Sequence, residues 1–587
     1  MSALEVHRID DIPLLYAQIK ELSIQEIIDD SIIPHKNRTG ISLGHVVSIW
    51  LCYLLSESDH RLSHVENWVA ENLILLITLS EEKEMSSKDF TDDRLEQTLD
   101  YLSKASNWLS ISNRLNEKSL EVYDIDKGKT IRLDAAPMQG NHKIKESGLF
   151  QYGYSKHHDA RLGMLKIMLA CVDNELNGFG YPLAHVTVSG EKADDSLYIP
   201  VLEECEKTFS QTPMRKLYVG DSKMGSKENR SYIVTSQNDY LVPLSKLQLS
   251  QTERIEAIKK VRPEDYYQVY KTNKENKKVL VAQGFEQISK VIYKNKTGEE
   301  QEWEERRVFV LSRAYSVAQQ QGLENRIQRT TTRLQELFIS KQGKQVPKSK
   351  EEAEQITSKL LKEQGLGKLL AVEIIETYET KKIRAYKDRP AREEHWSTFQ
   401  VKITPNKTAI NNRKKELGWQ VYGTTLKKEE LDFEKIVWKY RNQNRVESRF
   451  NDLRNKVVPL MPIFLKKDNR VEALINVLMI CLKVCAVMEF KVAQQLRTNQ
   501  DKLDNIFEGN PKRSTETPTA KRLLKQFKGV SIAVIKKTEN RVPEILRTDL
   551  KSTQLKIIAL LGFDSTIFTE LPDKMKLFFS SGNISET

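Results

Sequence analysis

The stretch KLYVGDSKMGS (216–226) decides the fold class, because a short apolar strand there ends at an acidic residue, Asp221. A helix is expected before it, in SLYIPVLEECEKTF (196–209), and a helix and strand after it, in SKENRSYIVTSQNDYLVPL (226–244). Further upstream come three apolar, strand-like runs, in KTIRLDAAPMQG (129–140), LGMLKIMLACVD (162–173) and PLAHVTVSGEKADD (182–195). Strand runs followed by strand–helix alternation predict an α/β layer centred on a mixed sheet.

Asp134 ends the first of these strands as Asp221 ends the last. A strand end places a carboxylate at the rim of a sheet, where ligands bind in open α/β folds. Gly220 is expected to keep that rim open for close backbone approach. Taken singly, both acids have a commoner interpretation, because Asp134 fits a turn and Asp221 fits a helix cap.

A third acidic residue, Glu447, follows Asp221 by 226 positions (447 minus 221) in the segment YRNQNRVESRFNDLRNK (440–456). On one continuous α-helix, a single polar face would carry Tyr440, Gln443, Glu447, Asn451 and Arg454. The adjacent apolar stripe would be formed by Val446, Phe450, Leu453 and Val457. A solvated face of an ordinary helix would show the same pattern.

Carboxylates delivered by two strand ends and a distant helix suit a site for two divalent cations. Such cations, about 3.5–4 Å apart, clamp the attacking and leaving oxygens of a phosphoryl transfer. Magnesium prefers hard oxygen ligands, and one or two carboxylates usually hold each ion.

Length and composition bound the remaining choices. The 587 residues predict three or four domains, and the net charge of +11 with a pI of about 9.0 suits a polyanionic partner without proving one. The five cysteines are scattered and odd in number, which favours reduced thiols in a cytosolic compartment. The polar N-terminus predicts no signal peptide, and the apolar run 474–488 is too short and polar to span a bilayer, so a buried helix is expected. His45, His60 and His64 lack a fourth ligand at a useful spacing and are expected to be structural.

Together, the three acidic segments resemble bacterial insertion-sequence DDE transposases of the class with a Tyr–Arg–Glu–Lys signature. Tyr440 and Glu447 match this signature, Arg454 replaces its Lys and Gln443 replaces its Arg. Three further segments look similar to the family, QYGYSKHHDARL (151–162), GWQVYGTT (418–425) and PIFLKKDNRVEALINVLM (462–479). The resemblance covers roughly residues 126–245 and 396–490.

The resemblance implies an α/β, ribonuclease H-like mixed-sheet core, interrupted by a large insertion and flanked by a helical N-terminal domain and a mostly helical C-terminal tail. It implies two Mg²⁺ ions, replaceable by Mn²⁺, on Asp134, Asp221 and Glu447, which are then the catalytic residues. DNA contacts are expected from Tyr440, Gln443, Arg445, Arg454 and Lys456. The implied partners are double-stranded DNA, as terminal inverted repeats and target, and a second copy in the DNA complex. The implied location is the bacterial cytoplasm, at the nucleoid.

The expected domains follow these boundaries. A helical DNA-end-binding domain (1–125) precedes the first part of the core (126–245), an insertion that is β-rich and then helical (246–395), the second part of the core with the Glu447 helix (396–490) and a basic C-terminal region (491–587).

The implied activity is metal-dependent cleavage at the ends of a mobile element, followed by joining of the freed 3′-OH to target DNA. Two alternatives stay open. A nuclease on the same fold would keep all three acids without joining DNA. A catalytically inactive DNA-binding descendant is suggested by the Gln443 departure.

Overall fold

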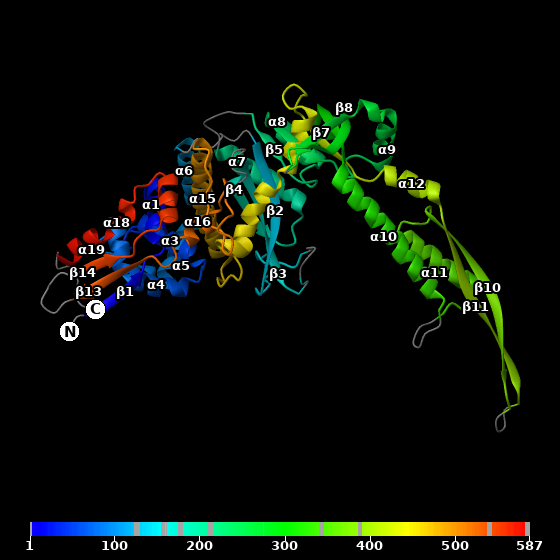
Figure 1. Ribbon diagram of the computed structural model, residues 1–587, viewed down its shortest axis with the longest axis horizontal. Coiled ribbons are helices and arrows are strands. Elements are labelled where there is room, and N and C mark those ends of the chain that lie inside the picture. The colour runs from blue at the N-terminus through cyan, green and yellow to red at the C-terminus, as the bar shows by residue number, and fades with distance from the viewer. Residues whose placement is uncertain are drawn as a thin grey trace. The chain divides into compact units, whose positions relative to one another are not determined.

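The computed structural model describes residues 3–122, 130–153, 159, 161–173, 180–208, 215–273, 275–339, 346–385, 390–536 and 543–580 (Figure 1). The chain forms two compact units. The first comprises Met1–Val242, Val291–Trp303 and Trp438–Thr587, and the second comprises Pro243–Lys290 and Glu304–Val437. The second unit therefore extends beyond the boundary at residue 395 that composition suggested.

In the first unit, a mixed sheet has the strand order β4-β3-β2-β5-β6. Its strands are β2 (Thr130–Gly140), β3 (Gly163–Asp173), β4 (Gly180–Ser189), β5 (Leu217–Val219) and β6 (Asp239–Pro243). The first three strands pair antiparallel, whereas β5 runs parallel to both β2 and β6. The predicted α/β layer on a mixed sheet is confirmed.

Helices supply the crossovers and the cover of this sheet. The predicted helices before and after β5 are present as α7 (Tyr198–Thr208) and α8 (Lys227–Thr235). Strand β3 is buried along its whole length, because α7 and the short helix α14 (Asn444–Asn451) both pack against it. Such continuous burial explains its mainly apolar sequence, which Lys166 interrupts.

The long helix α15 (Asp468–Thr498) packs against β4 and against helices of the N-terminal region. It is the one helix in the described part of the chain that is long and apolar enough to cross a membrane, and most of it is buried inside the unit. The expected buried helix is confirmed, although it is longer than the apolar run 474–488. Lys483 interrupts that run and is itself buried.

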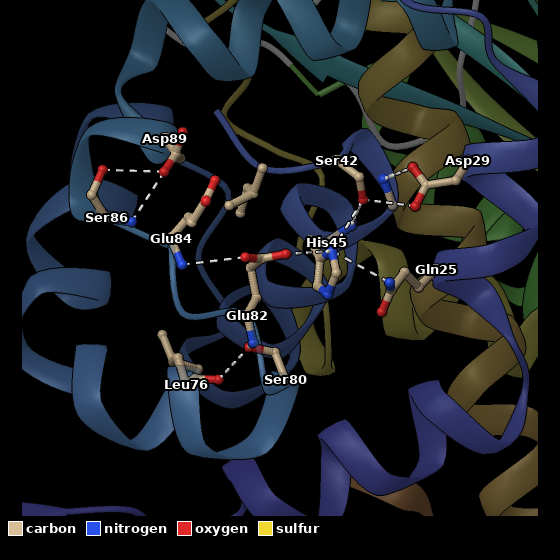
Figure 2. A network of polar contacts seen from close by, with 12 residues as sticks. Gln25, Asp29, Ser42, His45, Leu76, Ser80, Glu82, Glu84, Ser86 and Asp89 are labelled. Carbon is tan, nitrogen blue, oxygen red and sulfur yellow. Dashed lines mark hydrogen bonds and ion pairs between the residues drawn. The ribbon is translucent and has the colours of Figure 1, made fainter. Parts of the chain in front are cut away.

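The N-terminal region is mainly helical, as predicted, with α1 (Ile12–Glu21), α2 (Ile24–Ser31), α3 (Leu43–Glu57), α4 (Leu62–Ser80), α5 (Asp92–Leu102) and α6 (Ala105–Val122). Figure 2 shows the polar contacts that fix the start of α3. Ser42 Oγ accepts from the His45 backbone N–H and donates to Asp29, which also accepts from the Gly44 N–H. Because the His45 ring lies against Ser42 and Gln25 in this network, it has a structural role.

One strand in this region was not predicted. Strand β1 (Ala3–Arg8) pairs antiparallel with β13 (Ser531–Lys536), which pairs with β14 (Glu544–Arg547). The C-terminal region also contains α16 (Ala520–Lys525), α17 (Ser552–Leu560), α18 (Thr566–Thr569) and α19 (Leu571–Ser580). Helix α19 packs on α4, so the two ends of the chain share one body.

The second unit contains a sheet of order β12-β9-β8-β7 and a helical module with a long two-stranded ribbon. The sheet strands are β7 (Tyr267–Thr272), β8 (Lys278–Lys294), β9 (Glu300–Ser312) and β12 (Trp419–Thr424). The other elements are α9 (Gln251–Lys260), α10 (Arg313–Leu337), α11 (Lys350–Glu363), β10 (Leu370–Ile383), β11 (Arg392–Pro405), α12 (Lys407–Lys415) and α13 (Phe433–Arg441), which continues into the first unit. The β-rich part comes first and the helices α10 and α11 follow, but the strand β10 and the start of β11 lie where helical sequence was expected.

Candidate functional site

The parallel pairing of β2 with β5 brings Asp134 and Asp221 to matching positions in the sheet. Arg132 pairs with Val219, and each acid lies two residues further along its own chain segment. Because neighbouring strands are about 4.8 Å apart, the two residues lie close together. Asp221 follows the end of β5 as predicted, but Asp134 lies inside β2, which continues to Gly140, so the prediction that Asp134 ends its strand is wrong.

The charges of Asp221 and Glu447 reach Asp134. The pKa of the Asp134 carboxyl is raised to about 7, mainly by burial and also by the negative charges of Asp221 and Glu447, against the lowering effects of the Ala135 N–H and of the charge of Arg454. The three acids, which come from a strand, a loop and a helix, are therefore close enough for their charges to interact.

Asp221 is held through one of its two carboxylate oxygens. The Tyr198 hydroxyl donates to Asp221 Oδ1 at 2.7 Å, and the Lys223 and Met224 N–H groups donate to the same atom at 2.8 and 3.4 Å. Asp221 Oδ2 accepts no hydrogen bond from any described residue. Gly220 has a different role from the one expected, because a Cβ there would lie 2.5 Å from Met224 Sδ.

Glu447 lies in the first turn of α14, where a negative charge is favourable beside the helix N-terminus. The predicted apolar stripe is confirmed and orients this segment, since the side chains of Val446, Phe450 and Leu453 are buried. The Glu447 side chain is exposed and hydrogen-bonds to nothing in the described part of the chain.

The single continuous helix predicted for 440–456 is wrong. Helix α13 ends at Arg441, α14 begins at Asn444, and a π-helical turn follows over Asp452–Lys456. The break has a tertiary cause, because Gln443 Nε2 donates to the Leu133 carbonyl of β2 at 2.9 Å. Arg132 donates to the Lys439 carbonyl near the end of α13 at 2.8 Å, which satisfies an acceptor that continued helix would have used.

Arg132 and Arg445 converge on another carboxylate, Asp173. Arg132 Nε and Nη2 donate to Asp173 Oδ2 at 3.0 and 2.7 Å, and Arg445 pairs with Oδ1. The Asp173 and Arg132 side chains are buried. The structure therefore ties Arg445, an expected DNA contact, to an internal ion pair, and Gln443 to the backbone of β2.

Tyr440 lies beside the three acids. Burial raises the pKa of its phenol, and the charges of Asp221, Asp134 and Glu447 raise it further. Arg454 is exposed and close enough for its charge to act on Asp134. The side chain of Lys456 lies outside the described residues. The structure thus groups Tyr440 and Arg454 with the three acids.

Sequence reasoning missed three residues that position this site, namely Tyr198, Arg132 and Asp173. A signal existed for Arg132, because a lone cation inside the apolar run of β2 requires a buried partner. Asp173 follows an apolar run as Asp134 does, so in the sequence nothing separates their roles, and only the pairing of Asp173 with two arginines does so.

The donor set fits divalent cations in part. Among the described residues, no three His, Cys, Asp or Glu side chains are grouped so as to hold one ion. A two-metal site does not require such a group, since one or two carboxylates usually hold each ion. Asp134, Asp221 and Glu447 each have a carboxylate oxygen that accepts no hydrogen bond from a described residue. The pKa of Asp134 is raised, and a bound cation would stabilise its charged form. His60 and His64 form no such group, because His60 is buried against Phe464 and His64 pairs with Asp59.

Comparisons with known proteins match one family model and one solved structure to the chain. Residues 4–109 match the model of a domain of unknown function, DUF4277, which covers most of the N-terminal helices and none of the three acids. A solved structure described as a piggyBac transposase synaptic complex with hairpin DNA is 12% identical, with a TM-score of 0.22. That similarity covers 53% of this chain and 63% of the other, less than two thirds of its length, and it is too low to carry an argument about fold or function. No curated protein matches the chain.

Proposed function

We propose that this protein is a DNA transposase of an insertion sequence, which cleaves DNA at the element ends and joins the 3′-OH to target DNA. One observation carries the proposal: Asp134, Asp221 and Glu447 converge from separate segments with carboxylate oxygens that no described residue occupies. The mixed sheet, in which two antiparallel pairings adjoin two parallel ones, supports the ribonuclease H-like core that the sequence resemblance implies.

Each residue has a distinct role in this proposal. Asp134, Asp221 and Glu447 would hold two Mg²⁺ ions, or Mn²⁺ in their place. When bound, such ions acidify the attacking water or hydroxyl and stabilise charge on the phosphate. The Tyr198 hydroxyl fixes Asp221 through Oδ1 and leaves Oδ2 directed to other ligands.

Tyr440 and Arg454 are the proposed phosphate contacts. Arg454 is exposed beside Asp134, where a guanidinium can bind a phosphate oxygen pair. Arg445 and Gln443 would act indirectly, by holding α14 against β2 and β3. The substrate is proposed to be double-stranded DNA, held as two ends by a homodimer, and the net charge of +11 supports a polyanionic partner.

The test is cleavage and strand transfer on labelled DNA that carries the element's own ends, with Mg²⁺. Wild type is expected to cleave and join, and Asp134→Ala, Asp221→Ala and Glu447→Ala are each expected to do neither. Asp30→Ala is the matched control, because Asp30 lies in the same unit and pairs with Arg114 on the N-terminal helices.

Two results would overturn the proposal. Cleavage without joining would identify a nuclease on the same fold. DNA binding without metal-dependent cleavage would identify an inactive DNA-binding descendant.

A further inference from the structure

A second candidate site lies in the first unit, beyond the far end of β2. A cavity of about 430 Å³ opens there, between the segment that follows β2 and the segment that leads into α15. Its volume lies within the range of small-molecule sites. Both segments belong to stretches that resemble the transposase family, yet none of the proposed catalytic residues lines the cavity.

The rim of this cavity is cationic. Lys143, Lys145 and Lys466 line it, against one acid, Asp468. Lys145 Nζ donates to the Lys466 carbonyl at 3.1 Å, which links the two segments. Asp468 is engaged by the Leu149 N–H at 2.8 Å. Neither Lys143 nor Lys466 forms an ion pair with a described residue, so both ammonium groups are available to an anion.

An aromatic ring projects beside these lysines. The Phe464 side chain is 58% exposed, whereas its neighbours Ile463 and Leu465 are buried and hold it outward. One side of the ring lies against His60, with ring centroids 5.9 Å apart. A single exposed hydrophobic residue needs no explanation, but one held at the rim of a cationic cavity offers a stacking surface.

A further aromatic pair forms the cavity wall. His142 stacks on Phe150 with ring centroids 3.8 Å apart. The buried His142 Nδ1 has no hydrogen-bond partner among the described residues. Gly140 permits the close packing of this ring and of Met461, since a Cβ there would lie 3.3 Å from Nδ1 and 2.2 Å from Met461 Cε.

We propose that this cavity binds an unpaired nucleotide of a DNA strand, with its phosphates at Lys143 and Lys466 and its base stacked on Phe464. Aromatic rings and cations combined in this way bind single strands, whereas the base faces of a duplex are covered by their neighbours. That the bound strand is DNA rests on the proposed function. That the cavity prefers unpaired nucleotides rests only on the residues that line the cavity.

The strand β2 sets the position of this nucleotide. Asp134 and Gly140 are six residues apart on one continuous strand (140 minus 134), which corresponds to about 20 Å. At about 3.4 Å per nucleotide, the bound base would lie about six nucleotides from the phosphate at the three acids.

The test is fluorescence anisotropy of the full chain with labelled single-stranded dT12, the matching duplex and a single-stranded RNA of equal length, in EDTA. Phe464→Ala is expected to weaken dT12 binding about tenfold, and Phe464→Trp to restore it, because a ring stacks on a base in either case. Lys143→Gln and Lys466→Gln are each expected to lower the slope of log affinity against log salt by about 0.7.

Leu577→Ala is the matched control, since Leu577 is an exposed apolar residue on α19 in the same unit. It is expected to leave dT12 binding unchanged. The inference is overturned if Phe464→Ala leaves dT12 binding intact, if it weakens duplex binding equally, or if only RNA binding is lost. Because binding is measured without metal, it can succeed where cleavage fails, so the two proposals can fail separately.

Discussion

Two groups of charged residues lie close together in the first unit, and they differ in whether the carboxylates have cationic partners. Asp173 is buried and held by Arg132 and Arg445, whereas Asp134 and Glu447 have no cation bonded to them. Both groups are carried by the same two elements. Arg132 and Asp134 are two residues apart on β2, and Arg445 and Glu447 are two residues apart at the start of α14.

The presence or absence of cationic partners distinguishes a carboxylate with a structural role, Asp173, from the carboxylates proposed to bind metal, such as Asp134. A buried carboxylate with two guanidinium partners has its hydrogen-bonding capacity filled within the chain. At Asp134, burial and then the charges of Asp221 and Glu447 raise the pKa of the carboxyl, and an external cation would stabilise its charged form. Four substitutions would break or sharpen this comparison.

The largest effect is expected at Asp221→Asn. Its cleavage rate with Mg²⁺ should fall by about 10³-fold or more, because the amide removes a negative ligand oxygen while keeping the shape. Its thermal unfolding midpoint should stay within a few degrees of wild type. Retained cleavage, measured on labelled DNA ends, would place the chemistry elsewhere.

Asp173→Ala should act on stability instead. Removing this carboxylate leaves Arg132 and Arg445 without their shared partner, which is expected to cost about 3–5 kcal/mol in the free energy of unfolding. Urea denaturation measures this cost. An unfolding free energy close to that of wild type would show that the two groups of charged residues do not differ as described.

Lys483→Met tests a buried cation that lacks a carboxylate. Lys483 Nζ lies at the Asn116 amide oxygen and the Leu183 carbonyl, and burial lowers its pKa to about 7. The unfolded chain holds this proton up to about pH 10.4, so between pH 7 and 10 the unfolded state binds more protons and the stability of wild type rises with pH.

The Met variant should lose that pH dependence and gain about 1–2 kcal/mol near pH 6, where wild type carries the full cost of a buried charge. Unfolding free energies measured at pH 6, 8 and 9.5 distinguish the two proteins. Parallel curves would mean that Lys483 titrates normally in the folded chain.

The smallest effect is expected at Gln443→Arg, which restores the family signature. Gln443 Oε1 lies 3.5 Å from Arg132 Nη1, so a second guanidinium there would repel Arg132 and cost about 1 kcal/mol. Gln443→Glu is the matched control and should not repel Arg132. A gain in both urea resistance and cleavage from the Arg variant would show that Gln443 is a defect.

Local patterns predicted most of the sheet, although not that β2 continues beyond Asp134. The apolar runs before Asp134 and Asp221 are strands, and the stripe through Val446, Phe450 and Leu453 is buried, because each signal is contained within a few residues. The break at Gln443 could not be predicted, since its cause is the Leu133 carbonyl, 310 positions away.

The same limit applies to roles of side chains. Asp173 and Asp134 both follow apolar runs, and their sequences alone do not tell which one meets arginines. Strand β1 was hidden for a related reason, because its partner β13 lies more than 500 residues further along the chain.

That distant pairing governs how the protein can be made. Arg8 pairs with Ser531, so β1 leaves the ribosome 523 residues (531 minus 8) before its partner is synthesised. At about 5–20 residues per second, this segment waits roughly 25–100 s for its pairing partner. In an unfinished polypeptide, β1 therefore lacks β13, and an unpaired strand favours aggregation and proteolysis. The pairing of β1 can be completed only after translation has passed residue 536.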